Sequence, residues 1–338
     1  MIADVSVDTL RVGVIGVGRI GRLHAGLLAR QVPGAALAAI CDTDVRRAHE
    51  VGDELGVPVA DSVGELLASV DAVAICSSTA THADLIVAAA RAGRAIFCEK
   101  PLSLDLAELD RALAATAEAG VALQIGFNRR YDPAHRSVRE AVASGTIGEP
   151  HLVRISSRDP APPPAAYVRD SGGIFLDMMI HDFDMARYVT GSEVVEVYAR
   201  GERRIYEEAG DIDTAVVLVT HENRCLTTID NSRRATYGYD QRVEVFGSRG
   251  MAASENPPAH TGVIRTGEGT RTPPLPAFFL DRYVPSYVSG WEAFVAAVQT
   301  GVQPTVTGAD GRAPLVIGLA ARRSFAEDRP VRVEEIDS

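Results

Sequence analysis

The sequence predicts a two-domain protein, in which an α/β domain with a doubly wound parallel sheet precedes an α+β domain with a large, mostly antiparallel open sheet. Over residues 1–126, apolar β-branched runs alternate with helical segments, which is typical of a parallel sheet covered by helices. Over residues 127–338, short alternating runs separated by Gly, Asn and charged turns indicate antiparallel strands. The 338 residues, 46% of them hydrophobic, suffice for two cores.

The elements of the first domain follow from this alternation. Buried parallel strands read as short apolar runs, and amphipathic helices as longer runs with a helical period. The expected strands are 11–17, 35–41, 70–78, 94–102 and 121–128, and the expected helices are 23–30, 81–93 and 104–120.

A glycine turn follows the first strand, in the order Gly16-Val17-Gly18-Arg19-Ile20-Gly21. Glycines there permit a tight turn, a close approach of the backbone to a pyrophosphate, and packing of helix on strand, as in the Rossmann dinucleotide fold. The second strand ends in Asp42, 21 residues after Gly21, where a carboxylate can accept hydrogen bonds from an adenosine ribose. Thr43 and Asp44 follow, so NAD is favoured over NADP, although Arg46 and Arg47 keep NADP open.

Further polar residues stand at the carboxyl ends of later strands, where ligands of doubly wound sheets bind. The candidate cofactor-binding residues are Gly16, Gly18, Arg19, Ile20, Gly21, Asp42, Ser78, Thr79, His82, Glu99 and Lys100. The Lys100 ammonium could also stabilise negative charge on a substrate oxygen during hydride transfer. The alternative for Lys100 is a solvated side chain in a loop.

The second domain begins near residue 126, where the last parallel strand gives way to polar FNRRYD. Its expected elements are a helix ending at Gly145, strands from 151 and over 194–201, 214–221, 224–232, 241–248 and 331–333, and helices over 289–301 and 313–327. These C-terminal helices could pack back on the first domain. Residues 256–276, rich in Pro and Gly, are expected to form an irregular surface excursion.

Asp177 and His181 stand four residues apart, which on an α-helix places a carboxylate and an imidazole on one face. Such a pair can accept a proton from a substrate hydroxyl, although most pairs of this kind are surface ion pairs. Asp184 falls near the same face and could contact substrate, whereas Asp182 is expected to be solvated. A metal site of Asp177, His181 and Asp184 is possible, but hydride transfer needs no metal, and we expect none.

Charge and cysteine usage restrict partners and location. The net charge of −11 and the pI near 5.3 argue against binding to nucleic acid or to an anionic membrane. The N-terminus shows no secretory signal, and no apolar run is long enough to span a bilayer. Cys41, Cys76, Cys98 and Cys225 lie in apolar segments without metal or disulfide spacing, which predicts reduced thiols and a cytoplasmic protein.

Three motifs occur in one order: the glycine turn, Glu99-Lys100-Pro101 at a later strand end, and Gly172-Gly173 before Asp177-x-x-x-His181. In this order and spacing the chain resembles the Gfo/Idh/MocA oxidoreductase family over nearly its whole length. The segments FNRRYDP, SGTIGEPHLVRISSRDP, GGIFLDMMIHDFDMARY and RRATYGYDQRVEVFG look like its inositol 2-dehydrogenase branch. The resemblance implies a Rossmann domain, and a second, open sheet that often serves to assemble a homotetramer.

The resemblance also implies a catalytic set, which is Lys100, Asp177 and His181 here. Polyol-binding positions carried over from the branch are Arg129, Ser157, Asp159 and a tyrosine of YGYD, Tyr237 or Tyr239. With Asp184 they complete the expected substrate site. Ser157 and Asp159 depart from the histidine and asparagine of well-known inositol dehydrogenases, and the PAPPPAA segment is longer and richer in proline. These departures leave the stereoisomer open.

The implied activity is NAD-dependent oxidation of a secondary hydroxyl of a cyclic polyol, at C2 of myo-inositol, to 2-keto-myo-inositol (scyllo-inosose) and NADH. Within the same chemistry, scyllo-inositol or a pyranose sugar is the alternative substrate. From other classes, an NAD-dependent glycosidase and a non-catalytic sugar sensor on the same fold are the alternatives.

Overall fold

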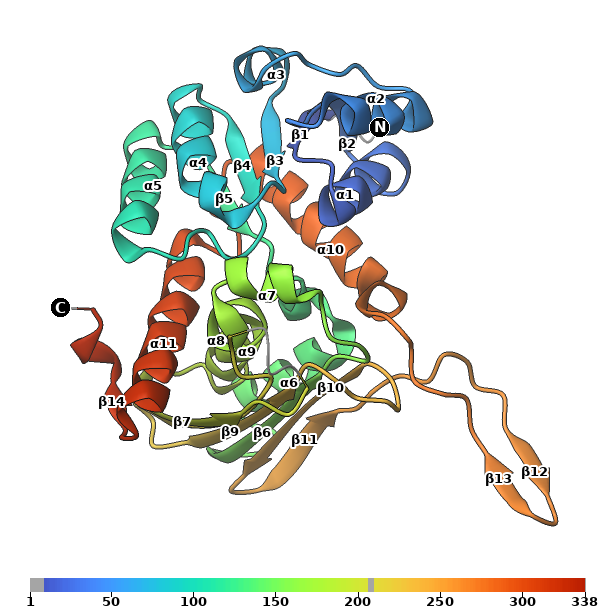
Figure 1. The fold of residues 1–338 in the computed structure, drawn as a ribbon, viewed down its shortest axis with the longest axis vertical. Helices are drawn as coiled ribbons and strands as arrows, with labels where there is room; N and C mark the ends of the chain where they lie inside the picture. Colours follow the sequence, from blue (N-terminus) through green and yellow to red (C-terminus); the bar gives the residue numbers. More distant parts are fainter. Residues whose placement is uncertain (1–8, 206–209, 338) are drawn as a thin grey trace, which may run out of the picture. The chain divides into compact units, whose positions relative to one another are not determined.

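The fold is described from a computed structural model that covers residues 9–205 and 210–337 (Figure 1). The chain separates into two compact units. The first comprises the residues up to Phe127 together with Tyr287–Arg312, and the second comprises Asn128–Ser286 together with Ala313–Ser338. The first division falls one residue after the expected boundary at 126. Part of the C-terminal region belongs to the first unit, so the second unit is not one continuous stretch of chain.

The first unit contains a parallel sheet in the order β2-β1-β3-β4-β5. The strands are β1 (Leu10–Ile15), β2 (Ala35–Cys41), β3 (Ala72–Ile75), β4 (Ala95–Cys98) and β5 (Leu123–Ile125). The helices are α1 (Arg19–Arg30), α2 (Val45–Leu55), α3 (Val63–Ser69), α4 (His82–Arg91) and α5 (Leu106–Ala119), with a 3₁₀ turn η1 at Thr79–Thr81. Because β2 and β3 flank β1 on opposite sides, the strand order reverses at the glycine turn, where doubly wound sheets bind their ligands.

Two helices of the first unit, α2 and α3, were not expected from the sequence, yet local capping explains them. The side chain of Asp44 accepts from the amide of Arg47 at the start of α2, and Ser62 accepts from Glu65 at the start of α3. Gly56 ends α2 in the left-handed conformation. Helix α2 lies in a charged segment with few apolar residues, and α3 is only seven residues long, so hydrophobic period alone did not reveal them.

The second unit is built on a seven-stranded sheet in the order β11-β10-β6-β9-β8-β7-β14. The strands are β6 (Pro150–Arg158), β7 (Val194–Glu202), β8 (Thr214–His221), β9 (Leu226–Ser232), β10 (Asp240–Gly247), β11 (Gly250–Ser254) and β14 (Val331–Arg332). All neighbouring pairs are antiparallel except β6 and β9, which are parallel. The expected open, mostly antiparallel sheet is therefore confirmed.

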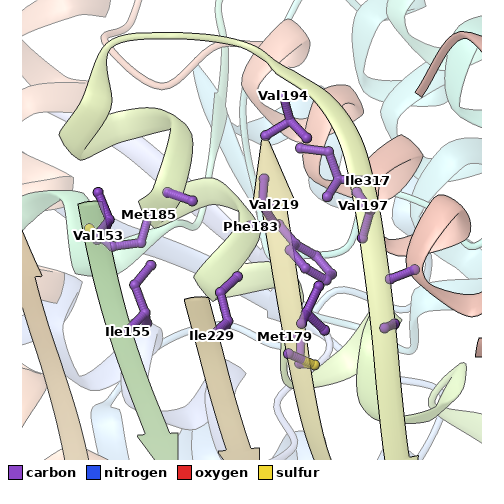
Figure 2. Packing of buried hydrophobic residues seen from close by; sticks show 14 of the residues in the cluster. Val153, Ile155, Met179, Phe183, Met185, Val194, Val197, Val219, Ile229 and Ile317 are labelled. Carbon is purple, nitrogen blue, oxygen red and sulfur yellow. The ribbon is translucent and has the colours of Figure 1, made fainter. Parts of the chain in front are cut away.

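Helices cover one face of this sheet. They are η2 (Asn128–Tyr131), α6 (Pro133–Ala143), α7 (Ala165–Asp170), α8 (Gly173–Asp177), α9 (Ile180–Thr190), α11 (Gly308–Glu327, from Ala313 on) and η3 (Val333–Glu335). Figure 2 shows Phe183 and Met185 of α9 among strand residues such as Val153 and Ile229. Phe183 is fully buried, so α9 is fixed to the sheet by its apolar side chains.

Two segments differ from the sequence-based expectation. Helix α10 (Phe279–Thr300) begins ten residues before the expected Ser289 and contains Pro285, because a helix can continue past a proline that removes one hydrogen bond. Residues 256–276 are not wholly irregular, since β12 (Ile264–Thr266) and β13 (Gly269–Arg271) pair as an exposed hairpin. In Figure 1 this hairpin extends away from the seven-stranded sheet.

Candidate functional site

The glycine turn between β1 and α1 has the shape that a dinucleotide requires. Gly16 adopts φ +84°, and a Cβ there would stand 2.7 Å from the backbone nitrogen of Ser77. A Cβ on Gly21 would stand 1.8 Å from the carbonyl oxygen of Gly16. Beside Gly18, in contrast, no described atom lies within 4 Å of the position of a Cβ. The turn is thus closely packed at its two ends and open at Gly18.

The open space at Gly18 lies at the N-terminus of α1. Gly18 is the N-cap and has no side chain to accept from the first amides, and the first turn of α1 contains no acidic residue. Backbone N–H groups at such a helix end attract an anion, and their dipole favours negative charge. These features fit the pyrophosphate of NAD, with Gly16, Gly18, Arg19, Ile20 and Gly21 as the residues that would hold it.

Asp42 ends β2 and orders the loops around this turn. Its Oδ2 accepts from the amide of Val17 at 2.8 Å, and its Oδ1 accepts from the amide of Asp44 at 2.8 Å. The Arg47 guanidinium lies 3.3 Å from the same Oδ1 and also pairs with Asp44. Arg47 is one of the two arginines that left NADP open as the cofactor, because an arginine can bind its 2′-phosphate. In the structure Arg47 is paired with Asp42, the carboxylate expected to bind the ribose.

The residues at the strand ends that are expected to bind cofactor differ in their exposure to solvent. Ser78 is exposed, and Thr79 and Lys100 are partly buried. His82, however, is only 1% exposed, and its ring nitrogens lie 2.8 Å from the carbonyl oxygen of Pro101 and 3.1 Å from that of Ser77. Burial lowers the pKa of His82, so the neutral ring ties two loops together. Contact of His82 with the cofactor stays a prediction.

Glu99 is likewise buried. Its Oε1 lies 2.8 Å from Nε2 of His24, and its Oε2 accepts from the amide of Lys100 at 3.3 Å. Glu99 is thus held by protein groups at both carboxylate oxygens. Lys100 stands two residues after the end of β4 and is joined to Pro101 by a cis peptide bond.

In the second unit, Asp177 and His181 do not share one continuous helix, which corrects the expected geometry. Asp177 is the last residue of α8, and α9 begins at Ile180. The amide of Met179 donates to the carbonyl of Ile174, five residues back, so α8 ends in a wide turn. The sequence shows the same spacing of four residues whether Asp177 and His181 lie on one helix or on two, so it could not reveal the break.

The carboxylate of Asp177 is positioned by two residues that the sequence did not single out. Tyr167 of α7 donates to its Oδ1 at 2.9 Å, and Arg233 donates to its Oδ2 at 3.2 Å. Arg233 is 1% exposed, whereas Tyr167 is largely exposed. His181 is partly buried at the first turn of α9.

Asp182 is fully buried and not solvated, which is the second correction. Its Oδ1 accepts from Nη1 of Arg129 at 2.6 Å, and its Oδ2 accepts from the side-chain amide of Asn231 at 2.8 Å. Burial raises the pKa of Asp182, while Arg129 and Asn231 oppose this effect. Arg129 is 7% exposed and thus forms a buried ion pair.

The expected substrate residue Ser157 belongs to the same buried network. Its hydroxyl donates to Oε1 of Gln241 at 2.8 Å and accepts from Nη2 of Arg129 at 3.3 Å. Ser157 is 0% exposed and its hydroxyl bonds to Arg129, so the side chain helps to position Arg129, and its expected contact with substrate stays a prediction. Gln241 and Asn231 were missed because only the pairing of β6, β9 and β10 places them opposite Ser157.

The charge of Arg129 acts on both Asp159 and Tyr239. Burial raises the pKa of Asp159 to about 6, Arg129 and Arg233 oppose the rise, and the charge of Asp177 adds to it. Burial also raises the pKa of Tyr239, and the charges that act on its hydroxyl include Arg129 and Asp159. Asp159 is partly buried and Tyr239 is 6% exposed.

Tyr237 lies in different surroundings. Its side chain is largely exposed, and its hydroxyl donates to Asp240 at 2.6 Å and accepts from Arg158 at 2.8 Å. Of the two tyrosines, Tyr239 has Arg129 and Asp159 among its surrounding charges, whereas Tyr237 has Asp240 and Arg158, and contact of either with substrate stays a prediction.

Asp184 forms an ion pair with Arg130, a different arginine from those that pair with Asp177 and Asp182. Nε of Arg130 donates to both carboxylate oxygens at 3.1 and 3.0 Å, and Nη2 donates to Oδ1 at 2.7 Å. With both oxygens engaged and 1% exposure, Asp184 forms a buried ion pair with Arg130, and its expected contact with substrate stays a prediction.

The structure thus groups the candidate residues by unit. The cofactor candidates and Lys100 belong to the first unit, and Arg129, Asp159, Asp177, His181 and Tyr239 belong to the second. Within residues 9–205 and 210–337, no three His, Cys, Asp or Glu side chains gather as a metal site would require. In the same ranges, no helix has the length and apolar character needed to span a bilayer.

Comparisons with known proteins agree with this arrangement. The family described as "Oxidoreductase family, NAD-binding Rossmann fold" matches residues 10–127, and the "GFO/IDH/MocA C-terminal domain" matches residues 135–253. The myo-inositol 2-dehydrogenase of Thermotoga maritima is 50% identical over 333 residues, which cover 97% of this chain and 99% of that protein. An inositol 2-dehydrogenase of Rhizobium meliloti is 44% identical over 330 residues, covering 96% and 99%.

Among solved structures, the scyllo-inositol dehydrogenase of Lactobacillus casei with bound NAD(H) and scyllo-inositol gives a TM-score of 0.90 at 31% identity. The match covers 96% of this chain and 99% of that one. The glycine turn, the two sheets and these full-length similarities together establish that the chain belongs to the Gfo/Idh/MocA family of NAD-dependent oxidoreductases.

Proposed function

We propose that the protein oxidises a secondary ring hydroxyl of an inositol with NAD, at C2 of myo-inositol, and forms scyllo-inosose and NADH. The observation that carries this proposal is the Asp177 carboxylate held by Tyr167 and Arg233 four residues before His181, in a family whose first domain binds NAD. The relative from Thermotoga maritima, half of whose residues are identical, is a myo-inositol 2-dehydrogenase.

Each member of the catalytic set has one role in this proposal. His181 takes the hydroxyl proton as general base, and Asp177 favours the imidazolium that results. Lys100 donates a hydrogen bond to the reacting oxygen as it becomes a carbonyl. NAD, when bound at the glycine turn of the first unit, would supply the hydride acceptor, and the alcohol would lose one hydride and one proton.

The charges of the second unit favour a neutral polyol over an acidic sugar. The guanidinium groups of Arg129 and Arg233 are each paired with a carboxylate, Asp182 and Asp177 respectively. An anionic substrate would therefore meet no excess of positive charge there. We assign Asp159 and Tyr239 to individual ring hydroxyls, because a carboxyl group and a phenol can each donate or accept.

The alternatives are separated by one assay of NADH absorbance with myo-inositol, scyllo-inositol, glucose and a methyl glucoside, whose glycosidic bond a glycosidase would hydrolyse. Steady NADH formation with one of them identifies a dehydrogenase and its substrate. Product without net NADH would indicate the NAD-dependent glycosidase, and neither signal would indicate the sensor. The bound scyllo-inositol in the Lactobacillus casei structure is the specific reason to include that isomer.

We further propose that the protein is a homotetramer that assembles through the outer face of the seven-stranded sheet. Met251, Phe246, Leu152 and Leu226 stand opposite one another on β11, β10, β6 and β9, and each is exposed. An uninterrupted apolar row of this kind is typical of an interface.

The four cysteines are free and buried, which agrees with a reducing compartment, and we propose that the protein is located in the cytoplasm.

Replacing His181 with Ala should lower kcat by about a hundredfold or more, because the hydroxyl proton loses its acceptor. Binding of NAD, measured by calorimetry, should be unchanged, since no cofactor candidate is altered. His49→Ala, at an exposed position of α2, is the matched control and should keep full turnover. Unchanged turnover in His181→Ala would refute the assignment.

Asp159 should make stability depend on pH. Its folded pKa of about 6 lies above its ordinary value of 3.8, so between these values the folded state retains a proton that the unfolded state has lost. The free energy of unfolding should therefore fall as pH rises from about 4 to about 6, by about 3 kcal/mol at most. Asp159→Asn should lack this fall. Urea unfolding at each pH would contradict the expectation if both proteins gave parallel profiles.

Phe246→Glu should dissociate the tetramer, because it places a charge within the apolar row. Sedimentation velocity should show a smaller species for Phe246→Glu and the tetramer for the control Val263→Glu, which is exposed before β12 and outside the row. A monomeric unsubstituted protein, or an intact tetramer of Phe246→Glu, would exclude this interface.

A further inference from the structure

We propose that Trp291, His24 and Glu99 form a hydrogen-bonded chain that positions Lys100, and that Trp291 and His24 are therefore positioning residues for the reaction. All four residues belong to the first unit. This inference rests on the role proposed above for Lys100. Neither His24 nor Trp291 was expected from the sequence to contribute to function.

The chain of hydrogen bonds is continuous and buried. Nε1 of Trp291 lies 2.8 Å from Nδ1 of His24, and Nε2 of His24 lies 2.8 Å from Oε1 of Glu99. The second oxygen of Glu99 accepts from the amide of Lys100. Trp291 and His24 are 0% exposed and Glu99 is 7% exposed, so water does not compete for these bonds.

The partners of His24 determine its tautomer. The indole of Trp291 can only donate, so Nδ1 of His24 must accept and carries no proton. The proton of the neutral ring is then on Nε2, which donates to the Glu99 carboxylate. His24 is therefore a fixed donor to Glu99.

Aromatic packing holds the chain in place. The ring of Phe97, on β4, stacks on Trp291 with centroids 4.4 Å apart and an angle of 21° between the ring planes. Tyr287 lies edge-on to His24 at 5.4 Å. Phe97 stands two residues before Glu99 on the same stretch of chain. The stacking therefore fixes the indole of Trp291 to β4, the strand that leads to Glu99.

Gly126 leaves room for the Glu99 carboxylate. A Cβ at position 126 would stand 2.9 Å from Oε1 and 3.2 Å from Oε2 of Glu99. The carboxylate is therefore confined between the His24 ring and the backbone of Gly126. In this position it accepts from the Lys100 amide and fixes the main chain from which the Lys100 side chain extends.

The test compares His24→Met, which cannot donate, with His24→Gln, whose amide can still donate to Glu99. In His24→Met, kcat should fall by about tenfold or more, the loss expected for one hydrogen bond to a charged group, while KM for NAD stays within about twofold. The Lys100 amide should also exchange its hydrogen faster, as measured by mass spectrometry. His24→Gln should restore most of both properties.

The emission of Trp291, the one tryptophan of the sequence, reports on the chain directly. Its maximum should shift to shorter wavelength in His24→Met, because the indole N–H loses its acceptor. The matched control is Gln124→Met, which removes a buried bond from Nε2 of Gln124 to the carbonyl of Gly290 on the same helix. This control should leave kcat and the Lys100 amide unchanged.

The outcomes separate this inference from the proposed function. If His24→Met folds and neither kcat nor exchange at Lys100 changes, or if Gln124→Met loses as much, the positioning chain is refuted. If His24→Met does not fold, Trp291→Phe keeps an aromatic ring against Phe97, removes the N–H together with the five-membered ring that carries it, and should change exchange at Lys100 in the same direction. If the exchange results hold but the unsubstituted protein oxidises no polyol, the proposed function fails and the chain stands.

Discussion

The buried ion pair between Arg129 and Asp182 is the interaction on which the second unit depends. A bond of 2.6 Å joins two charges that are almost completely removed from water, and desolvating them is costly unless every remaining polar atom finds a partner. Asn231 and Ser157 supply such partners from β9 and β6. Removing one member of such a pair typically costs about 3–5 kcal/mol, because the other charge is left buried.

This pair also sets the surroundings of the candidate site. Asp182 follows His181 directly at the start of α9, so fixing Asp182 to the sheet fixes the backbone that carries the histidine. A second pair, Arg233 with Asp177, holds the carboxylate at the end of α8. Asp159 is left with a raised pKa among these charges, which suits a group that exchanges hydrogen bonds with neutral hydroxyls.

Much of the fold could be predicted from the sequence, because glycine turns, strand periods and the Asp42 spacing are local signals. The broken helix could not, since residues 177 and 181 have the same spacing in one helix or two. The burial of Asp182 could not either, because it depends on Arg129, 53 positions away. Likewise, the bond between Ser157 and Gln241 could not be predicted, because it depends on the pairing of β6 with β10. Sequence periodicity found the elements, and tertiary pairing decided which polar residues are structural.

The central claim is that hydride leaves C2 of an inositol ring for NAD, and myo-inositol carrying deuterium at C2 tests it most directly. Mass spectrometry of the reduced cofactor should find one deuterium per molecule formed, with an unlabelled ketone at C2 of the product. Reduced cofactor without deuterium would place the oxidation at another carbon, and a product formed with no reduced cofactor at all would contradict a dehydrogenase.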